Sequence, residues 1–124
     1  MTPIERARQL VEETWSDTTK WDANLKAAHE ILEMAAAAEP ANTTTLVCLG
    51  AVLSDRGKPQ EAVDVLEKAI KLGSTDRNAY RNLAIALMDC DIAGRERAPS
   101  VFKQAESLES SPQTWEAYFD PHGY

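Results

Sequence analysis

Apolar residues recur at helical spacing on both sides of a glycine turn in the middle of the chain. One such stripe covers residues 43–55, and a second covers residues 59–72. Intervals of three and four residues place the apolar side chains on one face of an amphipathic helix. Between the two stripes, Gly57 can adopt the left-handed conformation that ends a helix, and Pro59 suits the first turn of the next helix. The pattern therefore predicts a helical hairpin with a short connection.

The pattern of this hairpin returns along the chain at a period of 34 residues. A single hairpin cannot bury both of its apolar stripes, so neighbours of the same kind are expected beside it. Small residues recur where two helices must cross closely, and bulky ones recur where the gap between them must be filled. The corresponding positions are Ala28, Leu32, Ala35 and Pro40 in a first, incomplete unit, Leu46, Leu49, Gly50, Leu53, Ala62, Leu66 and Ala69 in a middle unit, and Tyr80, Leu83, Ala84, Leu87, Ala98, Phe102 and Ala105 in a last unit.

A 34-residue period of paired helices resembles the tetratricopeptide repeat, whose unit carries Leu-Gly, a Tyr-like position, Ala, a Phe-like position and a closing Pro. The resemblance extends over roughly residues 22–109. It implies an all-α fold built as a right-handed superhelical stack of antiparallel helix hairpins, with about three repeats and a C-terminal capping helix. We expect one repeat domain over residues 1–119, with units at about 3–40, 43–74 and 77–110, a cap at 111–119 and a frayed tail at 120–124.

Start and stop signals place the ends of the helices. The Thr-Pro-Ile-Glu sequence at residues 2–5 is typical of a capping box with proline in the first turn. Asn42 or Thr43 can cap the first helix of the central hairpin, and residues 73–76 supply a glycine stop followed by a cap. Helices are therefore expected over residues 3–15, 22–39 and 77–89, in addition to the central hairpin.

The last two helices are predicted from a proline and from a group of aromatic residues. Pro99 follows the alanine that usually lies inside the second helix of a unit, so we expect that helix to start late, over residues 99–108, after a loop at 89–97. Three aromatic side chains fall on one side of a short helix at 111–119. Because a repeat array needs a terminal element to cover its last apolar face, this helix is interpreted as a cap.

Length and charge narrow the range of partners. The chain has 124 residues, enough for one domain with a modest core, and a formal net charge of -7. Nucleic acid and anionic membrane both require a positive patch, so neither is expected as a partner. The acidic balance fits simple solubility or attraction to a basic partner. The sequence shows no apolar stretch of signal-peptide or membrane-spanning length, which predicts a cytoplasmic location.

Motifs for catalysis and metal binding are missing from the sequence. It contains no phosphate-binding glycine loop, serine nucleophile elbow or HExxH motif. His29 and His122 have no partner that the sequence identifies, and Asp89 and Asp91 offer too few oxygens for a calcium loop. The two cysteines lack CxxC spacing and are interpreted as reduced structural thiols. We therefore expect no cofactor, no metal and no catalytic residues, so the chain is not predicted to be an enzyme.

The surface of the expected stack offers one candidate site. When such hairpins stack, the first helix of each pair lines the concave side, and its residues opposite the core stripe face a groove. An apolar base with one Arg and two Asn suits an extended peptide or a helix, because a guanidinium binds carboxylate and amides hold backbone. The predicted partner-binding residues are Val47, Ala51, Asp55, Asn78, Arg81, Asn82, Ile85 and Met88.

Two function classes follow from these observations. The first is a non-catalytic protein-protein interaction module that binds a protein or peptide segment in the concave groove, as an adaptor, a chaperone or an immunity-like inhibitor. The alternative is a structural self-assembly protein that forms a homodimer through its Trp- and Tyr-rich terminal helices. Its seam would be Trp15, Trp21 or the group of Trp115, Tyr118 and Phe119. The sequence also leaves open that the groove residues are only solvated surface.

Overall fold

The computed structural model describes residues 1–118 of the 124, and within them the chain forms helices and irregular segments without a strand. The elements in chain order are α1 (Pro3–Ser16), the short 3-10 helix η1 (Thr18–Lys20), α2 (Trp21–Ala38), α3 (Thr43–Asp55), α4 (Pro59–Lys71), α5 (Arg77–Cys90) and α6 (Ile92–Ala105). The prediction of an all-α chain is confirmed for the described residues. The predicted ends of α1, α2 and α5 lie within one residue of the observed ones.

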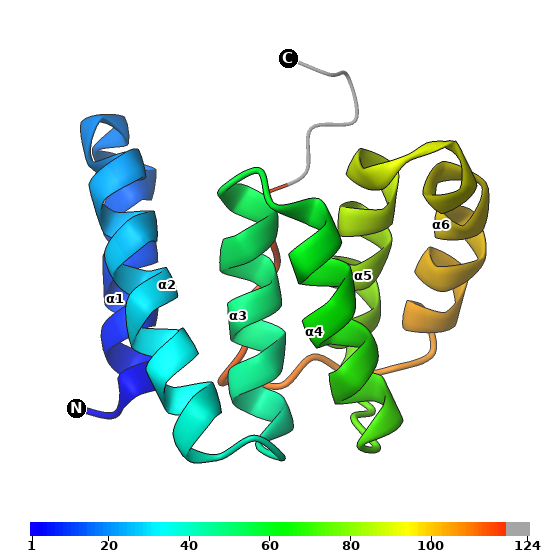
Figure 1. The fold of residues 1–124 in the computed structure, drawn as a ribbon, viewed down its shortest axis with the longest axis horizontal. Coiled ribbons are helices and arrows are strands. Elements are labelled where there is room, and N and C mark those ends of the chain that lie inside the picture. Colours follow the sequence, from blue (N-terminus) through cyan, green and yellow to red (C-terminus); the bar gives the residue numbers. More distant parts are fainter. Residues whose placement is uncertain (119–124) are drawn as a thin grey trace.

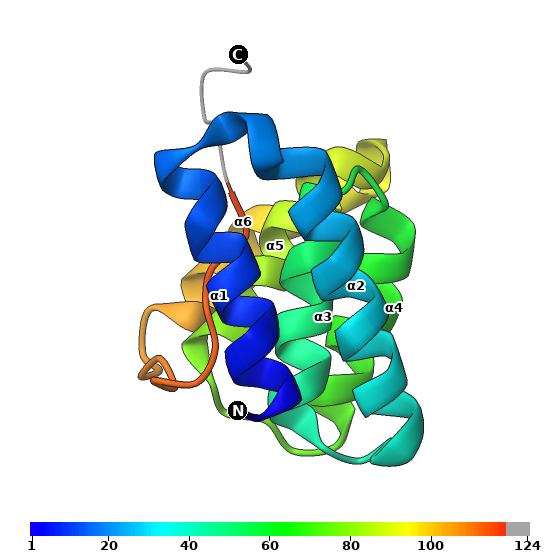
Figure 2. The same cartoon turned by 90° about the vertical axis from the view of Figure 1, so that its left-hand side faces the viewer.

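Each α-helix packs against the next one along the chain, and α3 also contacts α5. Figure 1 shows the helices as a row that runs from α1 and α2 at one end to α6 at the other. In the view turned by 90°, α2 and α4 lie on one side, and the chain that follows α6 runs alongside α1 on the other (Figure 2). Residues after the last helix therefore return to the first.

Local signals in the sequence account for where several helices begin and end. In the capping box of α1, Thr2 accepts from the Glu5 backbone N–H while the Glu5 carboxylate accepts from the Thr2 backbone N–H. The side chains of Asn42 and Asp76 cap α3 and α5. Gly57 takes the left-handed conformation between α3 and α4, with φ at 74°. These predictions from the sequence are confirmed.

The core forms where successive helices cross closely. A Cβ atom added at Gly50 in α3 would overlap the side chain of Leu66 in α4, which is fully buried. Ala84, one period later in α5, is also fully buried in the main core. The close crossing that the sequence predicts at Gly50 is therefore present, and it depends on the absence of a side chain there.

Replacing Gly50 with alanine tests this crossing. The added methyl group must displace the buried Leu66 side chain, so we expect Gly50→Ala to lower the free energy of unfolding by about 2 kcal/mol, as overpacking does. Urea denaturation measures the change. In a Leu66→Ala background, which removes the overlapping atoms, the same substitution should be neutral or stabilising, because alanine is the better helix former. An equal loss in both backgrounds would contradict the overlap.

The start of α6 differs from the prediction. The helix begins at Ile92, well before Pro99. The Asp91 carboxylate caps it by accepting from the Gly94 N–H at 2.7 Å. A side chain at Gly94 would collide with the carbonyl oxygen of Leu87, so glycine lets α6 follow α5 after a single residue. The expected loop at 89–97 was wrong because this cap and this close approach start the helix early.

Pro99 lies inside α6 without ending it. Proline removes one backbone donor from a helix interior and clashes with the preceding turn, which disfavours but does not forbid this placement. On either side of it, Ala98 and Val101 are buried in the core, at 0% and 3% exposure. Packing of this face therefore outweighs the local preference, and the helix ends at Ala105 rather than at Leu108.

Residues 111–118 form no helix, so the prediction of a capping helix over 111–119 is wrong. The backbone N–H groups of Ser111, Ala117 and Tyr118 donate to side chains of α3, α5 and the residue that caps α5. These bonds replace the ones that a helix would make within itself. Phe119 and the expected frayed tail at 120–124 lie outside the described residues.

Candidate functional site: the groove that holds residues 111–118

Residues 111–118, called the return segment below, lie across α1, α3 and α5 (Figures 1 and 2). Arg8 in α1 donates to the carbonyl of Pro112 at 2.6 Å. The Sγ atom of Cys48 in α3 lies 3.6 Å from the carbonyl oxygen of Gln113. The return segment therefore contacts alternate helices of the chain, α1, α3 and α5. The surface that these three helices form beneath the segment is called the groove.

Asp76 fixes the start of the return segment. Its Oδ1 atom accepts from the backbone N–H groups of Asn78, at 3.0 Å, and of Ser111, at 2.9 Å. Its Oδ2 atom accepts from the Thr114 hydroxyl at 2.6 Å. The Asn78 amide donates to the same hydroxyl oxygen at 3.0 Å. One carboxylate therefore caps α5 and ties the segment to the beginning of that helix.

Asn82 holds the middle of the segment by its backbone. Its Nδ2 donates to the carbonyl of Trp115 at 2.9 Å, and its Oδ1 accepts from the N–H of Ala117 at 2.8 Å. The Asn82 side chain is completely buried. A single amide therefore bonds to a C=O and an N–H two residues apart, as an adjacent strand would. Both contacts are to the main chain, so they do not depend on which side chains the segment carries.

From Trp115 to Tyr118 the side chains alternate between the core and the solvent. Trp115 and Ala117 are 6% and 4% exposed and belong to the main core, whereas Glu116 and Tyr118 are exposed. A period of two is that of an extended strand. The Tyr118 ring meets the ring of Trp21 edge to face, with centroids 6.4 Å apart. Residues 115–118 are therefore held as an extended chain with one face buried, after a turn at 112–113.

One charged contact lies at the edge of the groove. Nε of Arg81 is 2.9 Å from Oε1 of Glu116, an ion pair whose N–H is not aligned for a hydrogen bond. The same guanidinium lies over the Phe102 ring, 5.6 Å from its centroid. Because both partners of the ion pair are partly exposed, it contributes at most ~1 kcal/mol to stability. Its main effect is to favour an acidic side chain at this position.

Asp55 lies at the far end of the segment, where its Oδ1 accepts from the Tyr118 N–H at 2.8 Å. Burial disfavours the charged carboxylate and raises the pKa of Asp55 from 3.8 to about 6. The hydrogen bond from Tyr118 acts in the opposite direction but is the smaller effect. The charge that Asp55 carries at neutral pH is therefore destabilising in the folded chain.

The raised pKa of Asp55 predicts how stability changes with pH. The folded chain binds this proton more tightly than the unfolded chain, so the contribution of Asp55 to stability falls as the pH rises from about 4 to about 6. Asp55→Asn keeps an oxygen for the Tyr118 N–H and removes the charge. We expect it to raise the free energy of unfolding by on the order of 2 kcal/mol near pH 7.5 and to change it little near pH 4. Urea unfolding at both pH values makes the comparison, and equal effects would argue against the burial of this charge.

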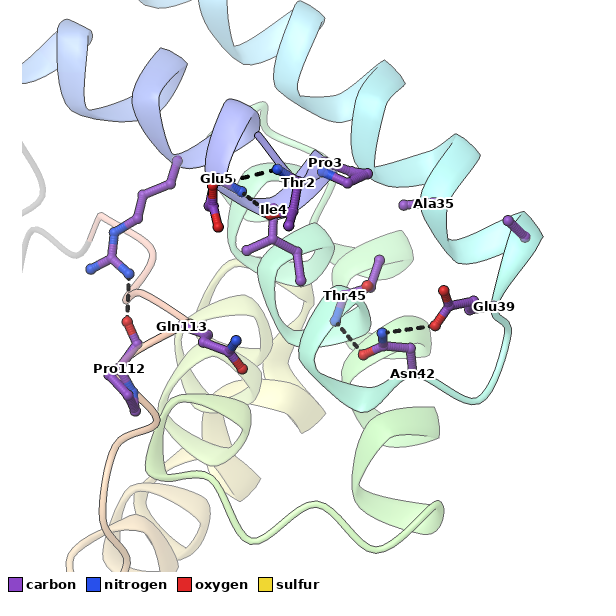
Figure 3. Close-up of a pocket in the computed structure, with 12 residues that line it drawn as sticks. Thr2, Pro3, Ile4, Glu5, Ala35, Glu39, Asn42, Thr45, Pro112 and Gln113 are labelled. Atoms are coloured by element: carbon purple, nitrogen blue, oxygen red, sulfur yellow. Dashed lines mark hydrogen bonds between the residues drawn. The ribbon is translucent and has the colours of Figure 1, made fainter.

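A cavity of about 460 Å³ borders the first residues of the return segment. The start of α1, the end of α2 and the start of α3 surround it (Figure 3). Pro3, Ile4 and Ala35 contribute apolar surface, and the side chain of Gln113 points toward the cavity from the segment. The groove therefore continues beside the segment into a space that suits an apolar side chain.

The structure divides the eight predicted partner-binding residues into two groups. Those that bond to the return segment are Asp55, Asn78, Arg81 and Asn82. Those that pack in the core instead are Val47, Ala51 and Ile85, none more than 1% exposed, and Met88, which is partly buried against it. The side chains of the second group are therefore part of the core, and no bond from them to the return segment is found. That any of the eight binds a partner stays a prediction.

Sequence reasoning missed the return segment and the groove residues Arg8, Cys48 and Asp76. Asp76 was expected only as a helix cap. The order apolar, polar, apolar at Trp115, Glu116 and Ala117 is a sequence signal for extended structure, but three residues are too few to decide it. The aromatic residues in the same stretch also fit a helical face.

The buried His29 side chain lies against Arg56 and Glu33. Nη1 of Arg56 lies 2.6 Å from Nδ1 of His29, and because a guanidinium can only donate, Nδ1 accepts and Nε2 carries the proton toward Glu33. His29 is 8% exposed, so it is more buried than the sequence suggested. Burial raises the pKa of the Cys48 thiol to about 12, which keeps it protonated and unreactive. Cys48 and Cys90 are free thiols, as predicted.

Two further findings concern residues 1–118 as a whole. They bring no three His, Cys, Asp or Glu side chains together in an arrangement suited to a metal ion. In the same part of the chain, no helix combines the length and the apolar character that crossing a bilayer requires.

No protein-family model matches this sequence, and neither the curated proteins nor the solved structures contain a significant match to it. The geometry of the groove is therefore the basis for the functional interpretation.

Proposed function

We propose that this chain is a non-catalytic protein-interaction module of the tetratricopeptide type, whose helices form a right-handed superhelical stack and whose groove binds an extended segment of a partner protein. The observation that carries the proposal is the pair of hydrogen bonds from the buried Asn82 amide to the backbone of Trp115 and Ala117. An extended peptide from another protein can make the same two bonds, because they involve only main-chain atoms.

Other residues of the groove support binding of a peptide. Arg8 donates to a backbone carbonyl near one end of the segment, and Asp55 accepts from a backbone N–H at the other. Between them, Arg81 favours an acidic side chain. The net charge of -7 favours partners that carry basic residues outside the groove. Such a module would serve as an adaptor, a chaperone or an immunity-like inhibitor.

An array of extended peptides tests this function. We test binding in a chain that carries Trp115→Ala, because Asn82 also holds the chain's own segment and its loss would otherwise weaken peptide and competing segment together. In that background we expect the chain to bind a subset of the peptides, and Asn82→Ala to weaken their binding at least about tenfold, which corresponds to the ~1.4 kcal/mol of one hydrogen bond. Asn24→Ala is the matched control, since Asn24 bonds to Leu10 and Glu13 and has no bond to the return segment. Binding that Asn82→Ala leaves unchanged in a folded chain would count against the groove.

Self-assembly through terminal aromatic residues is the second candidate, and the exposure of Trp15 is what favours it. Trp15 and Tyr118 are 66% and 65% exposed, whereas Trp115 is buried and cannot form a seam without leaving the groove. Exposed aromatic side chains are frequent in protein interfaces. Sedimentation at high concentration should then show a dimer that Trp15→Ala abolishes. A monomer at all concentrations would exclude this candidate.

A further inference from the structure

The return segment describes the kind of ligand that the groove accepts. Backbone bonds from Asn82 and Asp55 hold any extended chain, so selectivity has to come from side chains that the groove encloses. Trp115 and Ala117 are enclosed, at 6% and 4% exposure, and the half-exposed Glu116 between them faces Arg81. Thr114 is also enclosed, at 4% exposure, and its hydroxyl is bonded to Asp76 and Asn78.

Each position accepts a narrow range of side chains. At position 115 the core would lose its largest contact from this segment if the aromatic ring were absent. At position 117 the Cβ atom is enclosed, which favours a small residue. At position 116 the guanidinium of Arg81 favours a carboxylate over a neutral or basic group.

We propose that the return segment occupies the groove as an intramolecular ligand, and that the external ligand is an extended peptide with the same pattern: a large aromatic residue, then an acidic residue, then a small residue. This inference rests on the proposed function of the groove. The bound external peptide replaces residues 111–118, so only molecules whose own segment is undocked can bind it. The apparent affinity for the partner is therefore the intrinsic affinity multiplied by the undocked fraction.

The cavity beside Gln113 gives an external peptide an advantage over the return segment. Gln113 is exposed and polar, whereas Pro3, Ile4 and Ala35 present apolar surface to that cavity. A peptide with a larger apolar residue two positions before its aromatic residue would bury that surface, which the return segment does not do. The preferred external pattern therefore begins with an apolar residue at the position of Gln113.

Binding of a labelled peptide to the full chain tests the inference. The probe is the sequence of residues 111–118, SPQTWEAY, with a fluorescent label, measured by anisotropy. We expect Trp115→Ala to weaken docking of the chain's own segment and so to increase affinity for the probe at least about tenfold over the unsubstituted chain. A probe with Leu in place of Gln should bind more tightly still. Trp15→Ala, an equal truncation of an exposed residue, should bind the probe like the unsubstituted chain.

Two further measurements keep the test decisive. If Trp115→Ala loses its helical circular dichroism, Glu116→Lys replaces it, because Glu116 is half exposed and its substitution removes no core atoms. We expect a two- to threefold increase in affinity from that variant. In the unsubstituted chain, excess probe should speed hydrogen exchange at the N–H groups of Ala117 and Tyr118, which are bonded only while the segment is docked.

The outcomes separate the inference from the function on which it rests. Equal probe affinity in all folded variants would overturn the intramolecular ligand. Binding of unrelated extended peptides as tightly as the probe, still lost on Asn82→Ala, would overturn the sequence pattern and leave the proposed function standing. Failure of every folded variant to bind any extended peptide would overturn both. A doubled mass that Trp115→Ala abolishes would show that the segment is exchanged with a second copy, which also overturns the inference.

Discussion

Asn82→Ala is expected to lower the free energy of unfolding by about 3 kcal/mol. The substitution removes two buried hydrogen bonds at once and leaves the carbonyl of Trp115 and the N–H of Ala117 without a partner. A buried group that loses its partner costs about 1–3 kcal/mol, so two such groups exceed the loss from most surface substitutions. Urea denaturation monitored by circular dichroism and by tryptophan fluorescence measures the change.

The loss of stability from Asn82→Ala has an upper limit, which is set by how strongly the return segment docks. The proposal that the return segment detaches while the helices stay folded implies that Asn82→Ala cannot cost more than the free energy with which the segment docks. In the Asn82→Ala chain, tryptophan fluorescence should then report release of Trp115, one of three tryptophans, at a lower urea concentration than circular dichroism reports the loss of helix. Asn24→Ala, whose bonds join α1 and α2, should instead move both signals together. A loss below about 1 kcal/mol from Asn82→Ala would show that the two bonds are not what holds the segment.

The helices could be predicted because their signals are local. The apolar spacing of three and four residues, the caps at Asn42 and Asp76 and the left-handed Gly57 all act within one or two turns of the residue concerned. The crossing at Gly50 could be predicted as well, since the 34-residue period requires a small residue wherever two helices approach. Local propensity and tertiary packing agree at these positions.

Prediction failed where tertiary contacts oppose local signals. Pro99 is a helix breaker by itself, but α6 continues through it because Ala98 and Val101 are buried and because Gly94 allows a start directly after α5. The aromatic residues of the return segment, Trp115 and Tyr118, are three positions apart, which fits one face of a helix but not one face of a strand. The conformation of the segment is set by Asp76 and Asn82, which lie more than 30 residues away in sequence.

Part of the candidate site could be predicted from the positions of its polar residues along the helices. Asn78, Arg81 and Asn82 lie on the face of α5 that meets the return segment, and their polar ends could be assigned to a groove from their place opposite the core stripe. Val47 and Ile85 were assigned to the same groove but are core residues. An apolar residue on the less hydrophobic face of a helix does not reveal whether solvent, a partner or the chain's own backbone covers it.

Asp76→Ala is expected to cost about 3 kcal/mol, from two sources that can be separated. Loss of the α5 cap accounts for about 1 kcal/mol. The remainder comes from the Ser111 N–H and the Thr114 hydroxyl, which lose their shared acceptor at the start of the return segment. Asp76→Asn is the control, because asparagine caps helices as well as aspartate does but cannot accept from Thr114 with its amide nitrogen. It should therefore cost less than Asp76→Ala.

Combining Asp76→Ala with Asn82→Ala shows which part of the loss belongs to the segment. Once Asn82→Ala has released the return segment, the bonds from Asp76 to Ser111 and Thr114 no longer contribute, and only the cap of α5 remains to be lost. The double variant should therefore be more stable than the sum of the single losses predicts, by on the order of 2 kcal/mol. Additive losses would mean that the two ends of the segment are held independently, and that it does not leave the groove as one unit.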